Sequence, residues 1–495
     1  FESAFACNGN GLCHHYGADE VMCPSYKATG DPALSPKGRV DLLRSWLADD
    51  RPDADFEDAI ASNLHQCLSC SACTGRCPVE VDIPELKSRF FDNYYARNKR
   101  PLSHYLMSRF EELASVAARV PAVARLGLKP AERLLGLVDL PAPRRANSPT
   151  YDTFTGQVGI DVVVVRDVFT SALEPETLAQ AVRVLEALGY ATAVSPFVGS
   201  GKFDHVKGRR KRFAKAVARQ ADLIRSITAT GAVPAVVEPA VALLHRHEYP
   251  TMLPSYPKDS VASLVELLLA RQDLLSPVHD EGSVLLMGHC TERATEPDLA
   301  GGWAKVLRAA GYQVHAPDVG CCGMAGVFGH EADNQAMSRA LWDLTWQPAL
   351  DATGALPVAT GYSCRSQAKR FGGVAIGGHD PARYHELLRE PRADAVAGVK
   401  AHTVSWKGAT WRFADADSAA RFEADPARYA PAYNGHCANA LSLGEGLIRT
   451  DGTHWEIFGE ALFLFYAARG RTRWLEGDWE TYREAADAAW TTLSK

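Results

Sequence analysis

The sequence predicts a multidomain chain: a cysteine-rich α-helical domain, then a duplicated α/β domain with parallel sheets, then a small α+β domain. Three observations predict this class. Two cysteine runs near the start are separated by segments of helical periodicity. Residues 174–194 are repeated at 296–316 within strand–helix–strand alternation. Near residue 393 the pattern changes to the short alternating segments of a hairpin.

The composition excludes several classes of protein. The 495 residues are 46% hydrophobic and 23% charged, as in ordinary globular proteins, and the net charge of −6 gives no general attraction to nucleic acid. No apolar run approaches the ~18 residues of a membrane-spanning helix. Eleven of the twelve cysteines fall in three groups, which indicates metal binding in a reducing compartment. We therefore expect a cytoplasmic protein. Peripheral contact with the inner face of a membrane, through the basic and apolar residues 101–139, is the alternative.

The strongest motif is the run CLSCSACTGRCP at residues 67–78. Its C-x2-C-x2-C-x3-C-P spacing is that of bacterial ferredoxins, in which three close thiolates hold one [4Fe–4S] cluster and the fourth binds another. Buried free thiols would not explain this spacing, and zinc sites usually split their cysteines into two distant pairs. The run therefore predicts two iron–sulfur clusters.

A partner run lies at residues 7–24, with Asn10 at the position of its second cysteine. The crossed arrangement of ferredoxins assigns a [4Fe–4S] cluster to Cys67, Cys70, Cys73 and Cys23. It assigns the second cluster to Cys7, Cys13 and Cys77, with Asn10 at the missing ligand position. The fourth iron of this second cluster is either absent or bound by water, Asn10, His14 or His15.

Helical segments connect and follow the two runs. Residues 35–50 carry apolar side chains at helical spacing, and residues 81–101 begin a helix with Pro84 in its first turn. Residues 101–139 continue as helix with breaks at Pro121 and Pro130. We therefore expect an α-helical ferredoxin over residues 1–145, with a linker at 139–150.

The following segment, residues 151–390, contains an internal duplication. Each copy begins with an apolar strand, at 161–165 or 283–287, and continues through a helix that ends at Gly-Tyr. This alternation predicts parallel sheets covered by helices. We place the two copies at about 160–272 and 282–390.

Only the second copy carries cysteines in the loops after its strands. The first copy has Val168, residues 199–201 and Ala242 at the corresponding positions. Loss of the whole set from one copy indicates that the thiols act together at one cluster or metal site. Redox thiols with a vicinal disulfide are the alternative. The set is Cys290, Cys321, Cys322 and Cys364.

The pattern C-x30-C-C-G-x40-C followed by RSQ resembles the cysteine-rich CCG domain of heterodisulfide reductases and of glycolate- and lactate-oxidising iron–sulfur proteins. In that family the repeat ends C-x-x-C, whereas Gln367 stands here in place of the last cysteine. The resemblance implies a further iron–sulfur centre. Four thiolates are equally compatible with a cubane cluster or with zinc.

Residues 1 to about 385 resemble the iron–sulfur half of large FAD-linked D-2-hydroxyacid dehydrogenases, the D-2-hydroxyglutarate type in particular. The motifs CNGNGLC, VMCPSYKATGD, SPKGR and TGYSCRSQ carry this resemblance. It implies that an FAD domain precedes this segment, in keeping with a first residue that is not Met, and that Asn10 is an altered ligand position. No glycine-rich dinucleotide motif follows a strand here, so we expect FAD in an upstream domain or a partner subunit.

Residues 402–446 resemble a YHS domain. Alternation in TVSWKGATWRF predicts a hairpin that turns near residues 407–408, and a helix capped by Asp415 or Asp417 follows. We expect a small α+β domain with C-terminal helices over residues 393–495. The resemblance implies a weak metal site at His402, His436 and Cys437, and the alternative is an interaction module without metal.

The sequence thus predicts the electron-transfer module of an FAD-linked 2-hydroxyacid oxidoreductase of the D-2-hydroxyglutarate, glycolate or lactate type. Electrons from flavin enter the paired clusters and pass to the CCG site or directly to a quinone or another acceptor. One rival is a heterodisulfide-reductase-like enzyme that acts at the CCG thiols. The other is a metal-binding interaction protein that acts through its YHS domain. The basic residues of 201–220 form either a solvated face or a docking surface for an acidic flavoprotein or an anionic substrate.

Overall fold

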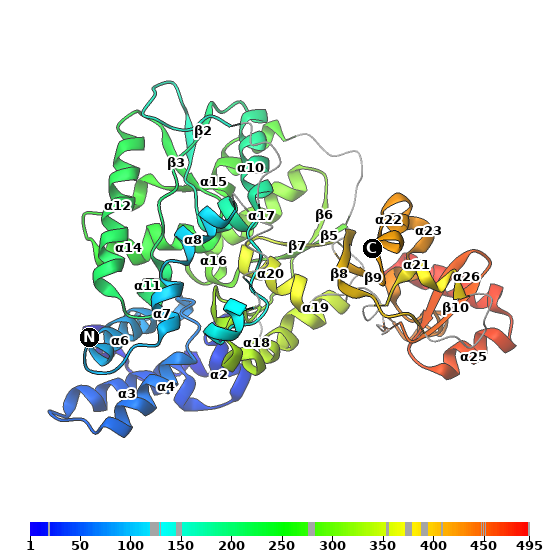
Figure 1. The fold of residues 1–495 in the computed structure, drawn as a ribbon, viewed down its shortest axis with the longest axis horizontal. Coiled ribbons are helices and arrows are strands. Elements are labelled where there is room, and N and C mark those ends of the chain that lie inside the picture. Colours follow the sequence, from blue (N-terminus) through cyan, green and yellow to red (C-terminus); the bar gives the residue numbers. More distant parts are fainter. Residues whose placement is uncertain are drawn as a thin grey trace.

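The computed structural model describes residues 1–17, 20–118, 128, 130–144, 151–275, 283–352, 356–371, 379–387, 395–406, 409–446, 448, 450 and 452–493. The N-terminal helices lie along one end of two α/β units, and the C-terminal domain stands at the far side of the second unit (Figure 1). The sequence prediction of a helix-rich chain with parallel sheets is confirmed.

Short helices with strong local start signals build the N-terminal domain. Ser35 caps α3 by accepting a hydrogen bond from the Gly38 amide at 3.0 Å, and Asp82 caps α6 by accepting from the Glu85 amide at 2.9 Å. Both helices carry proline in the first turn, where no intrahelical donor is lost. The helices are α1 (Glu2–Ala6), α2 (Pro24–Thr29), α3 (Pro36–Ala48), α4 (Ala54–His65), α5 (Ala72–Arg76), α6 (Ile83–Arg97), α7 (Leu102–Met107) and α8 (Phe110–Ala117).

The first α/β unit is a four-stranded parallel sheet in the order β2-β1-β3-β4. The valines of β1 are buried on both faces, as expected for a sheet covered by helices. Its strands are β1 (Val162–Val164), β2 (Thr192–Val194), β3 (Val233–Val236) and β4 (Ala262–Ser263). Its helices are η3 (Phe169–Leu173), α10 (Pro175–Ala187), α11 (Lys202–Val206), α12 (Arg210–Thr228), α13 (Pro239–Leu243), η4 (Leu244–Glu248), α14 (Tyr249–Met252) and α15 (Leu264–Ala270).

The second α/β unit repeats the first with three parallel strands in the order β6-β5-β7. The expected repeat distance is visible in its helices, because α17 (Pro297–Ala309) matches α10 residue for residue. The strands are β5 (Ser283–Met287), β6 (Gln313–His315) and β7 (Leu356–Ala359). The other helices are α16 (Cys290–Thr295), η7 (Phe328–His330), α18 (Gln335–Leu341), η9 (Trp342–Trp346), α19 (Gln347–Asp351), α20 (Tyr362–Phe371) and α21 (Pro381–Tyr384).

The C-terminal domain combines two antiparallel hairpins with short helices around an aromatic core. Asp415 caps α22 by accepting from the Ser418 amide at 2.8 Å, as one of the two expected caps. The hairpins are β8 (Val399–Trp406) with β9 (Ala409–Phe413) and β10 (His454–Phe458) with β11 (Ala461–Phe465). The helices are α22 (Ala416–Ala424), α23 (Pro426–Tyr429), α24 (Ala438–Ser442), α25 (Ala468–Glu476) and α26 (Trp479–Leu493).

Four sequence predictions fall outside the described residues. They are the helix break at Pro121, the end of the linker at 145–150, the boundary near residue 393 and the hairpin turn at residues 407–408. Within the described ranges, no helix has both the length and the apolar character needed to cross a bilayer.

Candidate metal centres

One cysteine-lined cavity lies between the start of α2, the end of α4 and the start of α5. The loop before α5 turns sharply, with left-handed backbone at Ser69 and Ser71, so that successive cysteines face inward. The cavity is lined by Cys23, Cys67, Cys70 and Cys73, the set that the crossed spacing predicts for one cluster.

Buried cations accompany this cavity. The Arg39 side chain is 1% exposed and donates to the Cys23 sulfur at 3.8 Å, while Lys87 donates to the Cys67 carbonyl at 2.7 Å. Burial opposes ionisation of Cys67, yet Arg39 and Lys87 together lower the pKa of this thiol. Burial lowers the pKa of Lys87 to about 8. Two buried cations beside four thiols fit a thiolate-bound, net anionic cluster, because an uncompensated buried charge is costly.

A second cavity lies between the segment before α2 and the residue that ends α5. Cys7, Cys13 and Cys77 line it, and Asn10 lines it at the expected ligand position. The Asn10 side chain makes local hydrogen bonds, since its oxygen accepts from the Leu12 amide at 3.0 Å and its nitrogen donates to Asn8 at 2.9 Å. Asn10 thus stabilises the local loop, and it occupies the position at which a fourth cysteine of this run is expected.

The two histidines beside this cavity have other partners. Nε2 of His14 lies 3.0 Å from the Ser35 hydroxyl, and Nδ1 of His15 accepts from the Gly17 amide at 3.2 Å. Both side chains are therefore used in the local loop structure.

The four cysteines of the second α/β unit form one chain of thiol contacts, from Cys290 through Cys321 and Cys322 to Cys364. Hydrogen bonding to Cys321 and burial raise the pKa of Cys290 well above its ordinary value. These thiols need a cation to become thiolates at neutral pH, as metal binding supplies. Gly323 follows with φ +88, and a Cβ there would lie 2.3 Å from the Ser338 carbonyl oxygen, so the loop requires glycine.

Gln367 takes a structural role at the position where the resemblance to the CCG pattern leads us to expect a cysteine. Its amide nitrogen donates to the Cys322 carbonyl and to the Ser338 hydroxyl, both at 2.8 Å, and its side chain is fully buried. Gln367 thereby holds the cysteine loop against α18 and leaves four thiols at this site.

The cysteine sites of the N-terminal domain and the second α/β unit are neighbours. Leu68 packs in one apolar cluster with Cys290 and Cys321, and Cys290 is among the charges that raise the pKa of Cys70 after burial. Helices α5 and α16 approach closely, since a Cβ on Gly75 would lie 2.5 Å from the Ala294 carbonyl oxygen. No motif or periodicity in the sequence indicated this contact.

Helix α8 packs against the loops of the first α/β unit that correspond to the cysteine-bearing loops of the second and carry no cysteine. These loops are called the emptied site below. The Glu111 carboxylate accepts from both the amide and the hydroxyl of Ser200, in the loop that corresponds to Cys321–Cys322. Val168, at the position of Cys290, packs against Ala114 and Ala118. The N-terminal domain thus supplies the groups that occupy the place of the missing thiols.

The basic segment 201–220 is mostly engaged within the chain, which neither sequence interpretation anticipated. Arg210 lies 2.9 Å from Glu85 of α6, Arg212 lies 3.2 Å from Asp204, and Lys207 lies 2.5 Å from Glu331. The Arg210 pair joins the first α/β unit to the N-terminal domain, and the Lys207 pair joins it to the second unit.

The three residues named for a C-terminal metal site have separate environments. The Cys437 sulfur accepts from the amides of Ala440 and Tyr466, and Nδ1 of His436 lies 2.9 Å from the Tyr433 carbonyl oxygen. His402 lies on β8. Across the described residues, no three His, Cys, Asp or Glu side chains converge as the ligands of a single ion would. Neither zinc nor a further cluster at these two positions therefore gains support from the described residues.

Comparisons with known proteins identify the N-terminal segment and its relatives. Residues 3–81 match the family described as a 4Fe-4S dicluster domain. The chain is homologous to D-2-hydroxyglutarate dehydrogenase of Pseudomonas putida, with 33% identity over 429 residues, which are 75% of this chain and 42% of that protein. The same enzyme of Escherichia coli is 32% identical over 443 residues, 76% of this chain and 43% of the relative.

A shorter relative aligns over most of its own length. The glycolate oxidase iron-sulfur subunit of Escherichia coli is 28% identical over 340 residues, which are 64% of this chain and 79% of that subunit. The chain spans less than half the length of the dehydrogenases it matches. No solved structure shows a significant match. The predicted iron–sulfur character and the relationship to oxidoreductases are thereby confirmed.

Proposed function

We propose that this chain is the iron–sulfur electron-transfer module of an FAD-linked 2-hydroxyacid oxidoreductase. The observation that carries the proposal is the pair of cysteine-lined cavities in the N-terminal domain, one of which adjoins the thiols of the second α/β unit at Cys70 and Cys290. Electron transfer between protein-bound centres needs such closely spaced sites. Similarity to dehydrogenases and to an oxidase subunit supports the reaction class.

In this proposal the cysteines hold clusters that supply one-electron carriers. Cys23, Cys67, Cys70 and Cys73 hold a [4Fe–4S] cluster, and Cys7, Cys13 and Cys77 hold the second. Cys290, Cys321, Cys322 and Cys364 hold a further centre. Arg39 and Lys87 compensate buried negative charge, and burial together with hydrogen bonds to sulfur tunes the potentials.

The names of the relatives support a direction of electron flow from a 2-hydroxy acid to the clusters. A 2-hydroxy acid, with D-2-hydroxyglutarate as the first candidate and glycolate or lactate as alternatives, is oxidised at FAD in an upstream domain or a partner subunit. The electrons pass through the N-terminal clusters to the CCG site and then to a quinone or another acceptor. We place the protein in the cytoplasm. The apolar side chains that α7 and α8 expose, Leu102, Tyr105, Leu113 and Val116, offer a peripheral membrane contact.

A direct test measures iron, sulfide and EPR spectra of anaerobically purified protein together with its flavin domain. Addition of D-2-hydroxyglutarate should reduce the clusters, and Cys70→Ser should abolish one cluster signal. Iron-free, folded protein would refute the proposal. Twelve irons per chain would indicate three centres and eight would indicate two, on about four irons per cubane.

A second candidate function uses the CCG thiols directly. Four buried thiols in mutual contact beside a cavity favour a heterodisulfide-reductase-like reaction. In that case the wild-type chain reduces disulfides and Cys321→Ser abolishes the activity. The electron-transfer function proposed above, called the relay below, predicts no such activity. A role through the YHS domain alone would be excluded if removal of residues 393–495 left electron transfer intact.

A further inference from the structure

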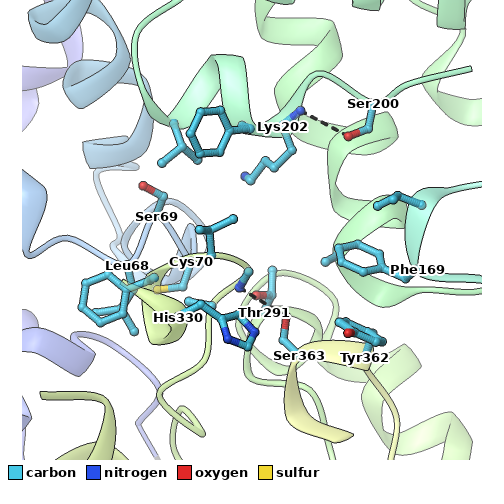
Figure 2. A pocket seen from close by; sticks show the side chains of 18 of the residues that line it. Leu68, Ser69, Cys70, Phe169, Ser200, Lys202, Thr291, His330, Tyr362 and Ser363 are labelled. Atoms are coloured by element: carbon cyan, nitrogen blue, oxygen red, sulfur yellow. Dashed lines mark hydrogen bonds between the residues drawn. The ribbon is translucent and has the colours of Figure 1, made fainter. Parts of the chain in front are cut away.

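A cavity of about 190 Å³ lies where the N-terminal domain and both α/β units meet. Cys70 lines it from the N-terminal cluster run, and Cys290, Cys321 and Cys322 line it from the second unit. The first unit contributes the loops of its emptied site, including Phe169 and Ser200. Figure 2 shows Phe169 and Tyr362 on one side, Leu68 and Cys70 on the opposite side, and Lys202 reaching in from above. The cavity therefore extends well beyond the four thiols.

Flat and apolar surfaces form its walls. The rings of Phe169 and Tyr362 stack with centroids 4.8 Å apart and an interplanar angle of 26°. Leu68, Leu244 and Phe328 are each more than nine-tenths buried and contribute further apolar wall. Such a lining favours a planar, largely apolar ligand.

The charged groups of the cavity balance in number, with Lys87, Lys202 and Lys207 against Glu111, Asp167 and Glu331. Lys202 is paired with Glu248 and Lys207 with Glu331, while Glu111 and Asp167 add carboxylates to the lining. Asp167 accepts hydrogen bonds from the Thr170 amide and hydroxyl, both at 2.9 Å. No net positive charge is left to attract an anionic substrate, so the lining disfavours a 2-hydroxy acid carboxylate.

Two buried polar groups at the cavity lack a nitrogen or oxygen atom as hydrogen-bond partner. They are the hydroxyl of Ser69, which contacts the Cys67 thiol, and Nδ1 of His289, on side chains that are each 6% exposed. A buried polar group without a partner is costly, and a ligand carrying carbonyl oxygens would satisfy both. Ser69 adjoins Cys70 and His289 adjoins Cys290, so these groups point a ligand toward both cysteine sites.

We infer that this cavity binds the electron acceptor as a flat, neutral, carbonyl-bearing molecule of the quinone class. The inference rests on the proposed relay function and adds the place where the relay ends. Two electrons from the reduced centres, which the 2-hydroxy acid supplies through flavin, and two protons from water convert the quinone to the quinol. Phe169 and Tyr362 hold the ring, and Ser69 and His289 hydrogen-bond to its oxygens.

The test uses ubiquinone-1 as the probe and the full chain, purified anaerobically with its clusters. Calorimetry on the oxidised protein should show saturable binding at one site per chain. Ala240→Phe places a ring into the cavity from α13 and should weaken binding at least tenfold. Ala229→Phe, at the exposed end of α12, is the matched control and should leave binding unchanged. Iron content and the EPR spectra of both variants should equal those of the wild type.

A second variant covers the case in which Ala240→Phe does not fold. Phe169→Ala removes one of the two stacked rings and should weaken ubiquinone-1 binding several-fold at unchanged iron content. Equal binding to wild type and variants, absence of binding to cluster-loaded protein, or displacement of ubiquinone-1 by D-2-hydroxyglutarate would each overturn the inference. In all three results, reduction of the clusters by substrate through the flavin domain would leave the relay standing. Loss of that reduction would instead refute the relay, and this inference with it.

Discussion

Arg365 of the second α/β unit lies 2.7 Å from Glu174 of the first. The relationship is reciprocal, because Arg246 of the first unit lies 2.7 Å from Glu296 of the second. Glu174 and Glu296 hold equivalent positions, at the N-termini of α10 and α17. The two arginines lie on corresponding segments, three positions apart at the repeat offset, and such an exchange of contacts indicates an approximate two-fold relation. The duplicated units therefore face each other, which places the emptied loops of one opposite the thiols of the other.

Loss of this bridge should destabilise the paired units. Arg365 also pairs with Glu238, whose side chain is 2% exposed. Arg365→Met leaves Glu238 buried without its cation, so it should lower the free energy of unfolding by about 3 kcal/mol. The urea midpoint, followed by tryptophan fluorescence, measures the effect. Arg339→Met is the control, since Arg339 and Asp343 are both about half exposed and their pair is worth under about 1 kcal/mol. Equal losses in the two variants would contradict this account.

Docking of the N-terminal domain should depend on pH through His205. Its ring nitrogens lie 3.3 Å from Glu85 of α6 and 3.3 Å from Glu248. Burial opposes the charge of His205, yet Glu248 and Glu85 raise its pKa above 6.5. Burial would raise the pKa of both glutamates, but His205 and neighbouring cations lower each to about 2. The stabilisation by His205 is therefore complete below pH 6.5 and lost as pH rises through its raised pKa.

We therefore expect the difference in melting temperature between the wild type and His205→Gln to shrink from pH 6 to pH 9. His245→Gln provides a control of opposite sign. Burial, followed by the charge of Arg246, lowers the pKa of His245 to about 3, so this histidine costs stability below pH 6.5. The melting temperature of the wild type minus that of His245→Gln should therefore grow as pH rises from 5 to 8. A His205 difference that is independent of pH would show that its charge contributes nothing.

Local spacing could predict the cysteine sets, but the contacts between domains could not be predicted. Spacing within a few residues identifies each run, and the crossed arrangement of paired runs assigns the last cysteine of one run to the cluster of the other, so Cys23 could be assigned to the cavity of Cys67 from the sequence. The hydrogen bond from the Ser200 amide to the Glu111 carboxylate joins residues that are 89 apart in the sequence, and no periodicity of the sequence indicates such a pair. The charges of residues 201–220 were visible, whereas their partners on α6 depend on the tertiary fold.

Single cysteine variants should separate cluster ligands from buried thiols. Cys73→Ser should remove the iron of one cluster, because Cys73 lines the four-cysteine cavity. Cys437→Ser should leave iron content unchanged, since Cys437 is equally buried but accepts hydrogen bonds from two backbone amides. Colorimetric iron assay and EPR measure both. Equal iron content in the two variants would remove Cys73 from the ligand set.

The approach of the N-terminal domain to the second α/β unit should be sensitive to one methyl group at Gly75. A Cβ at this position would lie 2.5 Å from the Ala294 carbonyl oxygen. A backbone atom cannot move aside as the end of a flexible side chain can. Gly75→Ala should therefore lower the free energy of unfolding by about 1–3 kcal/mol, as overpacking does.

The control for Gly75→Ala is the same substitution in open space. Gly301 is also helical, within α17, and a Cβ there would meet no atom within 4 Å. Gly301→Ala should raise the free energy of unfolding by about 0.5–1 kcal/mol, because alanine favours the helix and restricts the unfolded chain. Opposite signs of the urea midpoint shift in the two variants would locate the strain at the contact between α5 and α16. If both variants were stabilised, the two helices would not be in close contact, and Cys70 would no longer be held beside Cys290.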